Sequence, residues 1–144
     1  MLTVLMATYD GAATLPQVLA AYERLRAPGQ PWQLLVIDNG STDDTAAIVA
    51  SHANRLPLRL LREPQRGKNR ALNTALDVLL PTASEGDLFI FTDDDASPAP
   101  DWLQQWEMVA HEQPDYAVFG GAITPDWAVT PPDWLLRLVP TGLT

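Results

Sequence analysis

Short apolar runs alternate with amphipathic or capped segments along most of the chain. Runs typical of buried strands cover residues 2–7, 32–37, 56–61, 87–92 and 116–119. Between them, apolar spacings of three and four residues, capping residues and Gly or Pro breaks predict helices at 14–25, 41–49, 68–80 and 101–111. Ser41, with Asp44 three residues later, indicates a capping box at the start of the second helix. Pro57 predicts that the third strand begins late or lies at an edge of the sheet.

This order of strands and helices predicts an α/β fold. Continuously apolar strands separated by helices are typical of a mostly parallel sheet covered on both faces, a three-layer α/β/α sandwich. Such sheets bind ligands in the crevice outside the carboxyl ends of their strands. Polar clusters at residues 8–10, 38–40 and 93–95 follow predicted strands at that edge. We therefore expect a ligand site within a core of residues 1–123, followed by an extended Pro- and Trp-rich tail over 124–144.

The composition narrows the classes of function. Eighteen acidic and nine basic residues give a net charge of −9, which argues against a nucleic-acid-binding module with a basic face. The absence of cysteine excludes disulfides, thiolate metal sites and cysteine catalysis. No apolar run approaches the roughly 18 residues of a membrane-spanning helix, so we expect a cytoplasmic domain. His52 and His111 have no partner motif, and we interpret both as surface residues.

Basic and acidic residues are concentrated in different segments. Residues 55–70 hold six bases and one acid, whereas residues 85–144 hold eleven acids and one base, Arg137. If the fold brings these segments together, it offers cations for an anionic ligand beside carboxylates suited to a divalent metal. On charge alone, two solvated faces are the better interpretation, so the choice between them and a ligand site depends on the motifs.

Three consecutive carboxylates follow the predicted strand at 87–92. Asp93, Asp94 and Asp95 repel one another, and a divalent cation relieves that repulsion. Because a strand sends alternate side chains the same way, we expect Asp93 and Asp95 to face one site while Asp94 turns aside. Oxygen ligands alone favour Mg²⁺ or Mn²⁺ over zinc. The alternative is a solvated acidic turn that caps the next helix.

Two further segments carry candidate binding groups. Asp38 follows a predicted strand and precedes Asn39-Gly40, so its carboxylate either accepts hydrogen bonds from a ligand or closes a local turn. The segment 66–70, Arg-Gly-Lys-Asn-Arg, opens the predicted third helix, where free N–H groups and the helix dipole favour phosphate. An exposed basic helix start is the alternative. The segment lacks the spacing of a Walker loop.

Together these motifs resemble the nucleotide-binding half of a family 2 glycosyltransferase with a GT-A fold. The resemblance rests on residues 7–10, 36–45, 66–73 and 91–95, the last followed by 98–103. It implies an inverting transferase that uses a nucleoside diphosphate sugar, with Mg²⁺ or Mn²⁺ neutralising the leaving diphosphate. It implies that Asp38 contacts the base and that Lys68 and Arg66 lie near the diphosphate. The implied nucleotide-sugar site comprises Thr8, Tyr9, Asp10, Asp38, Arg66, Lys68, Asp93 and Asp94, and the implied metal ligands are Asp95 and Asp93.

The acceptor side of that family pattern is missing from the sequence. The family's general base lies in an acidic motif well beyond the D-x-D element, and we assign no base among the late acids Glu112, Asp126 and Asp133. We therefore expect an amino-terminal part of a longer transferase. Its acceptor would be a saccharide or a lipid-linked acceptor of the cell envelope, reached at the inner face of the membrane. Surface exposed by truncation predicts self-association.

Three other functions compete with this one. A sugar nucleotidyltransferase would carry a Gly-rich basic loop after the first strand, where residues 7–12 have one glycine and no base. A receiver-like signalling domain would need an acidic pair after the first strand and a Lys after the last, and no Lys follows Lys68. A binding domain that retains the donor pocket without catalysis is favoured only by the missing general base.

Overall fold

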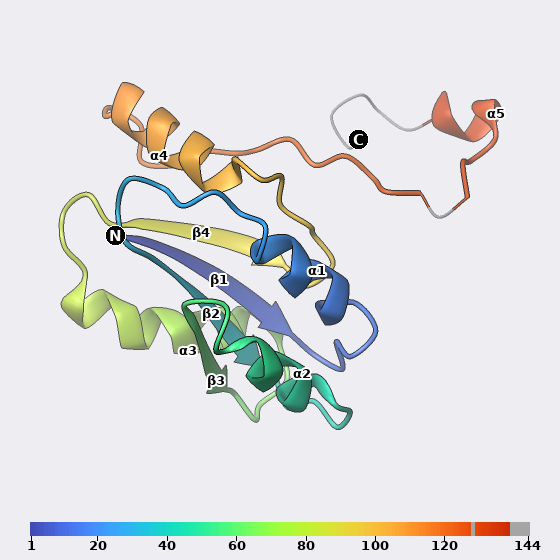
Figure 1. Ribbon diagram of the computed structural model, residues 1–144, viewed down its shortest axis with the longest axis horizontal. Helices are drawn as coiled ribbons and strands as arrows, with labels where there is room; N and C mark the ends of the chain where they lie inside the picture. The colour runs from blue at the N-terminus through green and yellow to red at the C-terminus, as the bar shows by residue number, and fades with distance from the viewer. Residues whose placement is uncertain (128, 139–144) are drawn as a thin grey trace. The chain divides into compact units, whose positions relative to one another are not determined.

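The computed structural model describes residues 1–127 and 129–138 (Figure 1). Its elements, in chain order, are β1 (Leu2–Thr8), α1 (Leu15–Tyr22), β2 (Trp32–Asp38), α2 (Thr45–His52), β3 (Leu58–Arg62), α3 (Lys68–Leu79), the 3₁₀ turn η1 (Leu80–Thr82), β4 (Leu88–Asp93), α4 (Trp102–Glu112) and α5 (Asp133–Leu136). The chain divides into two compact units, Met1–Glu112 and Gln113–Thr144.

Within the described residues, the strands form one parallel sheet in the order β3-β2-β1-β4. Its register aligns the carboxyl ends of the three strands that carry polar clusters: Thr8 pairs with Asp38, and Ala7 pairs with Asp93. The predicted parallel sheet is confirmed. Strand β3 starts directly after Pro57 and lies at an edge of the sheet, so the expectation drawn from Pro57 is confirmed.

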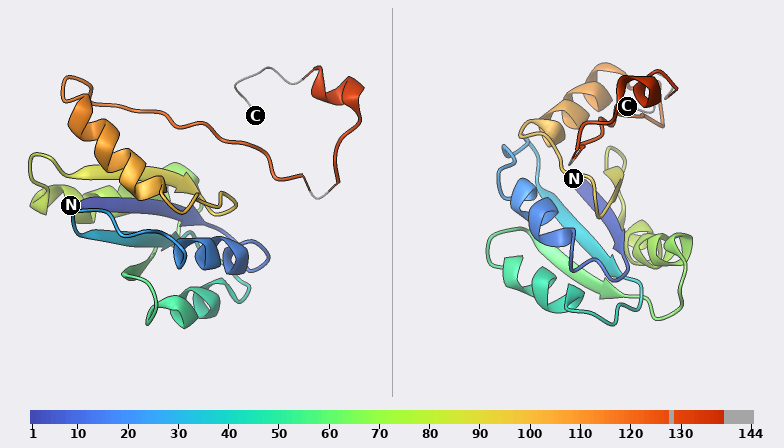
Figure 2. Two further views of the ribbon diagram at one scale, coloured as in Figure 1. Left: turned by 45° about the horizontal axis from the view of Figure 1, so that its top comes forward. Right: turned by 90° about the vertical axis from the view of Figure 1, so that its right-hand side faces the viewer.

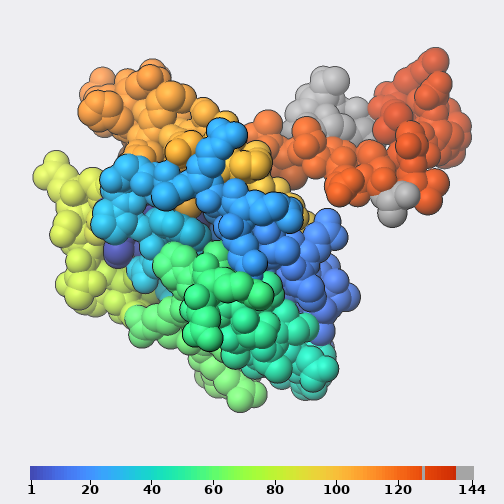
Figure 3. Space-filling model, viewed as in Figure 1, coloured from blue at the N-terminus to red at the C-terminus, as the bar shows by residue number. Residues whose placement is uncertain are grey.

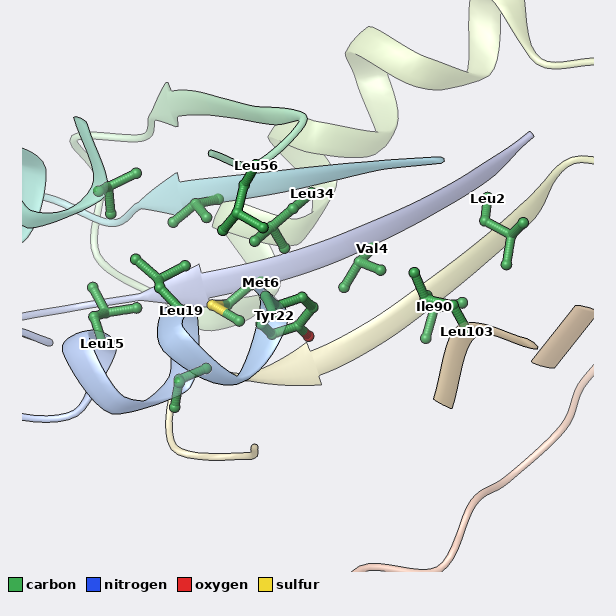
Figure 4. Close-up of a cluster of buried hydrophobic side chains, with 13 residues drawn as sticks. Leu2, Val4, Met6, Leu15, Leu19, Tyr22, Leu34, Leu56, Ile90 and Leu103 are labelled. Carbon is green, nitrogen blue, oxygen red and sulfur yellow. The ribbon is translucent and has the colours of Figure 1, made fainter. Parts of the chain in front are cut away.

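Alternate side chains of β1 enter two separate apolar clusters. Leu2, Val4 and Met6 pack on one face against residues of α1, α2 and α4, and all three are fully buried. Leu5 packs on the other face against α3, whose residues Ala71, Ala75 and Leu79 follow helical spacing. Figure 2 shows α3 on the opposite side of the sheet from α1 and α2, and Figure 4 shows the first cluster. The three-layer α/β/α architecture is therefore confirmed.

Helices α1 and α2 cover the face of the sheet that Figure 3 presents, in blue and green. Their limits differ from those expected. Helix α1 ends at Tyr22, before Leu25, and α2 begins at Thr45 rather than near Ser41. The predicted capping box is wrong: Asp44 is the N-cap residue and its side chain makes no capping hydrogen bond. Ser41 instead accepts a hydrogen bond from the N–H of Asp10 in the loop before α1.

The strand expected at 116–119 is absent from the described residues, where that segment has no regular structure. An apolar run forms a strand only when a partner supplies its hydrogen bonds, and residues 116–119 pair with none of the strands described. Strand β4 is consequently an edge strand, and Phe91 on it is 53% exposed. The expected core of residues 1–123 extends beyond the first compact unit, which ends at Glu112.

The interpretation of His52 as a surface residue is wrong. Its side chain is buried between helices, and Nδ1 lies 2.6 Å from Glu23 Oε1. Arg55 Nε also contacts Glu23, at 2.7 Å, so this ion cluster joins α2 to the end of α1.

Among residues 1–127 and 129–138, no helix has the length and apolar character needed to cross a lipid bilayer.

Candidate functional site

A pocket of about 220 Å³ opens at the carboxyl ends of β1, β2 and β4 and the start of α3. Its lining residues come from these four elements and the segments that follow them: Ala7, Thr8, Tyr9, Asn39, Lys68, Asp93 and Asp94. Five of the eight residues expected to bind a nucleotide sugar therefore line one pocket. Asp10, Asp38, Arg66 and Asp95 are not among its lining residues.

A cation and a carboxylate of the pocket lining form a direct ion pair. Lys68 is the first residue of α3, and Nζ donates a hydrogen bond to Oδ1 of Asp93, the last residue of β4. Gly67, directly before Lys68, has a φ of 137°, a conformation that L side chains rarely adopt. Both side chains of the ion pair are about half exposed, at 54% and 53%. A ligand phosphate can therefore reach the ammonium without opening the core.

Asp94 turns toward the end of β1. Thr8 Oγ1 donates to Asp94 Oδ2 at 2.5 Å, and Thr8 is buried. A Cβ on Gly11 would lie 2.3 Å from Thr8 Oγ1 and 3.0 Å from Asp94 Oδ2. The backbone at Gly11 thus packs directly against this hydrogen bond, and only a glycine leaves room for it.

Tyr9 and Arg66 form a stacked pair beside the pocket. The Arg66 guanidinium lies 4.4 Å from the centre of the Tyr9 ring and also donates a hydrogen bond to the Tyr9 hydroxyl. A hydrogen bond with Asp10 raises the pKa of the Tyr9 phenol. Tyr9 remains 41% exposed, so its ring offers an accessible flat surface.

The Asp10 carboxylate bonds to the neighbouring loop. Its Oδ1 accepts the N–H of Thr42 at 2.7 Å, and this backbone hydrogen bond is the main reason that the pKa of Asp10 lies below its ordinary value. Asp10 itself adopts a left-handed φ of 49°, which aspartate tolerates better than most residues.

Asp38, the last residue of β2, and Asn39, which follows it, have different hydrogen-bond partners. Asp38 is buried, and its Oδ1 accepts the N–H of Ser41 at 2.8 Å, which closes the local turn. Its Oδ2 accepts no hydrogen bond from any residue that the structure describes. Asn39 donates from Nδ2 to the carbonyls of Glu63 and Gln65, at 3.1 and 2.8 Å.

Asn39 lines the pocket but was not expected as a site residue. Its Oδ1 also accepts the N–H of Gly67 at 2.7 Å, so its side chain holds the segment that leads into Lys68. In the sequence, Asn39-Gly40 has the composition of an ordinary turn. The hydrogen-bond partners of the Asn39 side chain lie more than 20 residues away in the sequence, and no local pattern predicts them.

The carboxylates suit a metal whose coordination a ligand completes. Among the described residues, no group of three or more His, Cys, Asp or Glu side chains lies close enough to hold a metal ion. Mg²⁺ is commonly bound by one or two carboxylates together with substrate phosphates and waters. Asp93 lines the pocket and Asp95, two residues later, is exposed outside its lining, so each offers carboxylate oxygens to such a cation. The residues fit a divalent cation that arrives with a phosphate ligand.

Comparison with known proteins identifies the family. A profile of the family described as Glycosyl transferase family 2 matches residues 3–140. The glycosyltransferase AglE of Haloferax volcanii is 29% identical over 106 residues, which cover 72% of this chain and 33% of AglE. The dolichyl-phosphate beta-glucosyltransferase ALG5C of Trichomonas vaginalis is 33% identical over 92 residues, which cover 60% of this chain and 26% of that protein.

Solved structures support the same fold. The mannosyltransferase PcManGT from Pyrobaculum calidifontis, in complex with GDP-Man and Mn²⁺, matches with a TM-score of 0.64 and 33% identity, over 76% of this chain and 32% of that chain. TarS 1–349 of S. aureus, in complex with UDP-GlcNAc, matches with a TM-score of 0.65 and 25% identity, over 78% of this chain and 31% of that chain. In these four comparisons the chain spans a third or less of the relative. The fold is that of GT-A glycosyltransferases, and the chain belongs to glycosyltransferase family 2.

Proposed function

We propose that this chain carries the donor site of a glycosyltransferase that transfers a sugar from a nucleoside diphosphate sugar to an acceptor hydroxyl. One observation carries the proposal: the pocket gathers the Lys68 ammonium, the Asp93 carboxylate and the Tyr9 side chain at the carboxyl edge of the sheet. These groups suit the diphosphate, the sugar or ribose hydroxyls, and the base of such a donor. Relatives solved with UDP-GlcNAc and GDP-Man support this class of ligand.

The nucleoside would lie against the stacked pair of Tyr9 and Arg66. An exposed aromatic ring gives a base a flat apolar surface, and the guanidinium adds a cation beside it. Asp38 would accept an N–H of the base through Oδ2, because Oδ1 is already used by Ser41. Lys68 would leave Asp93 for the diphosphate, which carries more negative charge than one carboxylate.

Transfer would proceed by a single displacement with inversion. A divalent cation, Mg²⁺ or Mn²⁺, would neutralise negative charge on the departing nucleoside diphosphate. In this arrangement Asp93 and Asp95 hold that cation, and Lys68 adds a second positive charge to the leaving group. Deprotonation of the acceptor hydroxyl needs a general base, to which we assign no residue of this chain.

We propose a saccharide or a lipid-linked acceptor, approached from the cytoplasmic face of a membrane. Two relatives support this proposal: one is a dolichyl-phosphate beta-glucosyltransferase, and another is a glucosyl-dolichyl phosphate glucuronosyltransferase.

Calorimetric titration tests the donor site. The purified chain is titrated with UDP, GDP, dTDP and their common sugar conjugates, with and without Mn²⁺. We expect metal-dependent binding of at least one nucleotide and loss of the metal dependence in Asp95→Ala. Asp77→Ala is the matched control, because Asp77 is an exposed acid on α3 with no hydrogen bond to a described residue. Equal binding by both variants would refute the metal assignment, and no binding by the folded wild-type chain would refute the donor site.

A further inference from the structure

Three consecutive N–H groups in the loop after β1 each donate a hydrogen bond to a side-chain oxygen of residues 41–45, the segment that leads from β2 into the first turn of α2. We call this set of contacts the loop clasp. Its hydrogen bonds run from Asp10 N–H to Ser41 Oγ at 3.0 Å, from Gly11 N–H to Thr45 Oγ1 at 2.8 Å, and from Ala12 N–H to Asp43 Oδ2 at 3.0 Å. The two loops are more than 30 residues apart in sequence, so the clasp is a tertiary feature.

Asp43 organises the buried part of the clasp. Its Oδ1 accepts both the N–H of Thr45, at 3.0 Å, and the Thr45 hydroxyl, at 2.5 Å. A hydroxyl has one proton, and giving it to Asp43 leaves the oxygen as an acceptor for the N–H of Gly11. Thr45 is fully buried, so without this arrangement the Gly11 N–H would lack a partner in a place that water does not reach.

The clasp acts on the pocket through Gly11. The backbone at this residue packs against Thr8 Oγ1 and Asp94 Oδ2, two groups that line the pocket. Tyr9 lies between the pocket residue Thr8 and the clasped residue Asp10. A loop that loses its clasp would therefore shift the Tyr9 side chain and the Thr8–Asp94 hydrogen bond together.

We propose that Asp43 is a positioning residue for donor binding. Acting through Thr45, it fixes the loop after β1 so that Thr8 and Tyr9 line the pocket. Neither residue touches the pocket itself. This inference rests on the proposed donor site. It assigns Asp43 a role in affinity in addition to its role in the fold.

Two matched pairs of variants test it. Thr45→Val keeps the shape of threonine and removes the hydroxyl, whereas Thr45→Ser keeps the hydroxyl. Asp43→Asn removes one charge from the clasp, whereas Asp44→Asn removes one charge from the adjacent exposed residue, whose side chain makes no capping hydrogen bond. The dissociation constants for UDP and GDP are measured by calorimetry at a temperature at which circular dichroism shows each variant folded.

We expect Thr45→Val to weaken nucleotide binding by about tenfold and Asp43→Asn by about threefold or more, with Thr45→Ser and Asp44→Asn within about twofold of the wild type. A purely structural role would lower the unfolding temperature of Thr45→Val and leave the affinity of its folded form unchanged.

Unchanged affinity in folded Thr45→Val or in folded Asp43→Asn overturns the inference and leaves the donor site standing. If Thr45→Val does not fold, the exposed Asp43→Asn and Asp44→Asn pair decides alone. Equal loss in Thr45→Ser and Thr45→Val would show that the hydroxyl is not what matters, which also overturns it. A folded wild-type chain that binds neither UDP nor GDP overturns the inference and the proposed function together.

Discussion

Replacement of Gly11 by alanine tests the packing at the edge of the pocket. A Cβ at this position would lie 2.3 Å from Thr8 Oγ1, a separation that real Cβ atoms essentially never show. Thr8 is buried and β-branched, so its hydroxyl moves away only by rotating about the Cα–Cβ bond. That rotation breaks the 2.5 Å hydrogen bond to Asp94. The substitution therefore forces a choice between a clash and a lost hydrogen bond.

The expected loss of stability follows from these two terms. Overpacking of a buried site costs roughly 1–3 kcal/mol. A lost hydrogen bond to a charged group costs roughly 1.5–3 kcal/mol. Alanine recovers somewhat less than about 1 kcal/mol by restricting the unfolded chain. Because the substitution incurs one of these two costs and not both, we expect Gly11→Ala to lower the free energy of unfolding by about 1–2 kcal/mol.

Urea denaturation followed by circular dichroism measures this change. Gly120→Ala is the control, because a Cβ there meets nothing within 4 Å, and its unfolding free energy should change by less than about 0.5 kcal/mol. The double variant Thr8→Ala with Gly11→Ala removes the clashing oxygen. The double variant should therefore be more stable than the sum of the single losses predicts, by about 1–3 kcal/mol. Additive losses would refute the clash as the cause.

Three further variants test the site, its neighbouring loop and the exposed edge of the sheet. A hydrogen bond from the Thr45 hydroxyl lowers the pKa of Asp43 in the folded state. The ionised Asp43 therefore stabilises the fold above the pKa that it has in the unfolded chain, and this stabilisation is lost as the pH falls through its folded-state pKa. Asp43→Asn should accordingly reduce the fall in the urea midpoint between about pH 5 and pH 3. Lys68→Met should weaken nucleoside diphosphate binding by about tenfold in calorimetry and leave nucleoside binding unchanged, and equal effects on both ligands would contradict its placement at the diphosphate. Phe91 is exposed on an edge strand, so Phe91→Lys should shift size-exclusion elution toward the monomer, whereas a wild type that is monomeric at every concentration would contradict self-association.

Local patterns predicted the sheet, because each of its strands contains a run of apolar residues that can be recognised without knowledge of its neighbours. The apolar run at 2–7 became β1, and Pro57 correctly predicted a late, edge-lying β3. The apolar run at 116–119 had the same appearance and formed no strand among the described residues, because pairing depends on a neighbour that the run itself does not encode.

Contacts between distant residues were the part that the sequence could not predict. His52 is buried and contacts Glu23, which lies at the end of a different helix, 29 residues earlier. Asn39 has the local sequence of a turn residue, yet its side-chain amide donates hydrogen bonds to the carbonyls of Glu63 and Gln65. In both cases the residue type is ordinary in its local context, and only the fold brings the partners within hydrogen-bonding distance.

The run of three aspartates shows how the structure divides a cluster that the sequence presents as one motif. We expected Asp93 and Asp95 to share a side because strands alternate, but β4 ends at Asp93, so the alternation has no basis beyond that residue. Repulsion within the cluster is relieved by partners from two other elements: Lys68 at the start of α3 binds Asp93, and Thr8 at the end of β1 binds Asp94. Asp95 is exposed and has no such partner among the described residues. It is therefore the carboxylate with the least to lose on binding a phosphate-bound cation, which is why Asp95→Ala separates a metal-dependent donor site from an acidic turn.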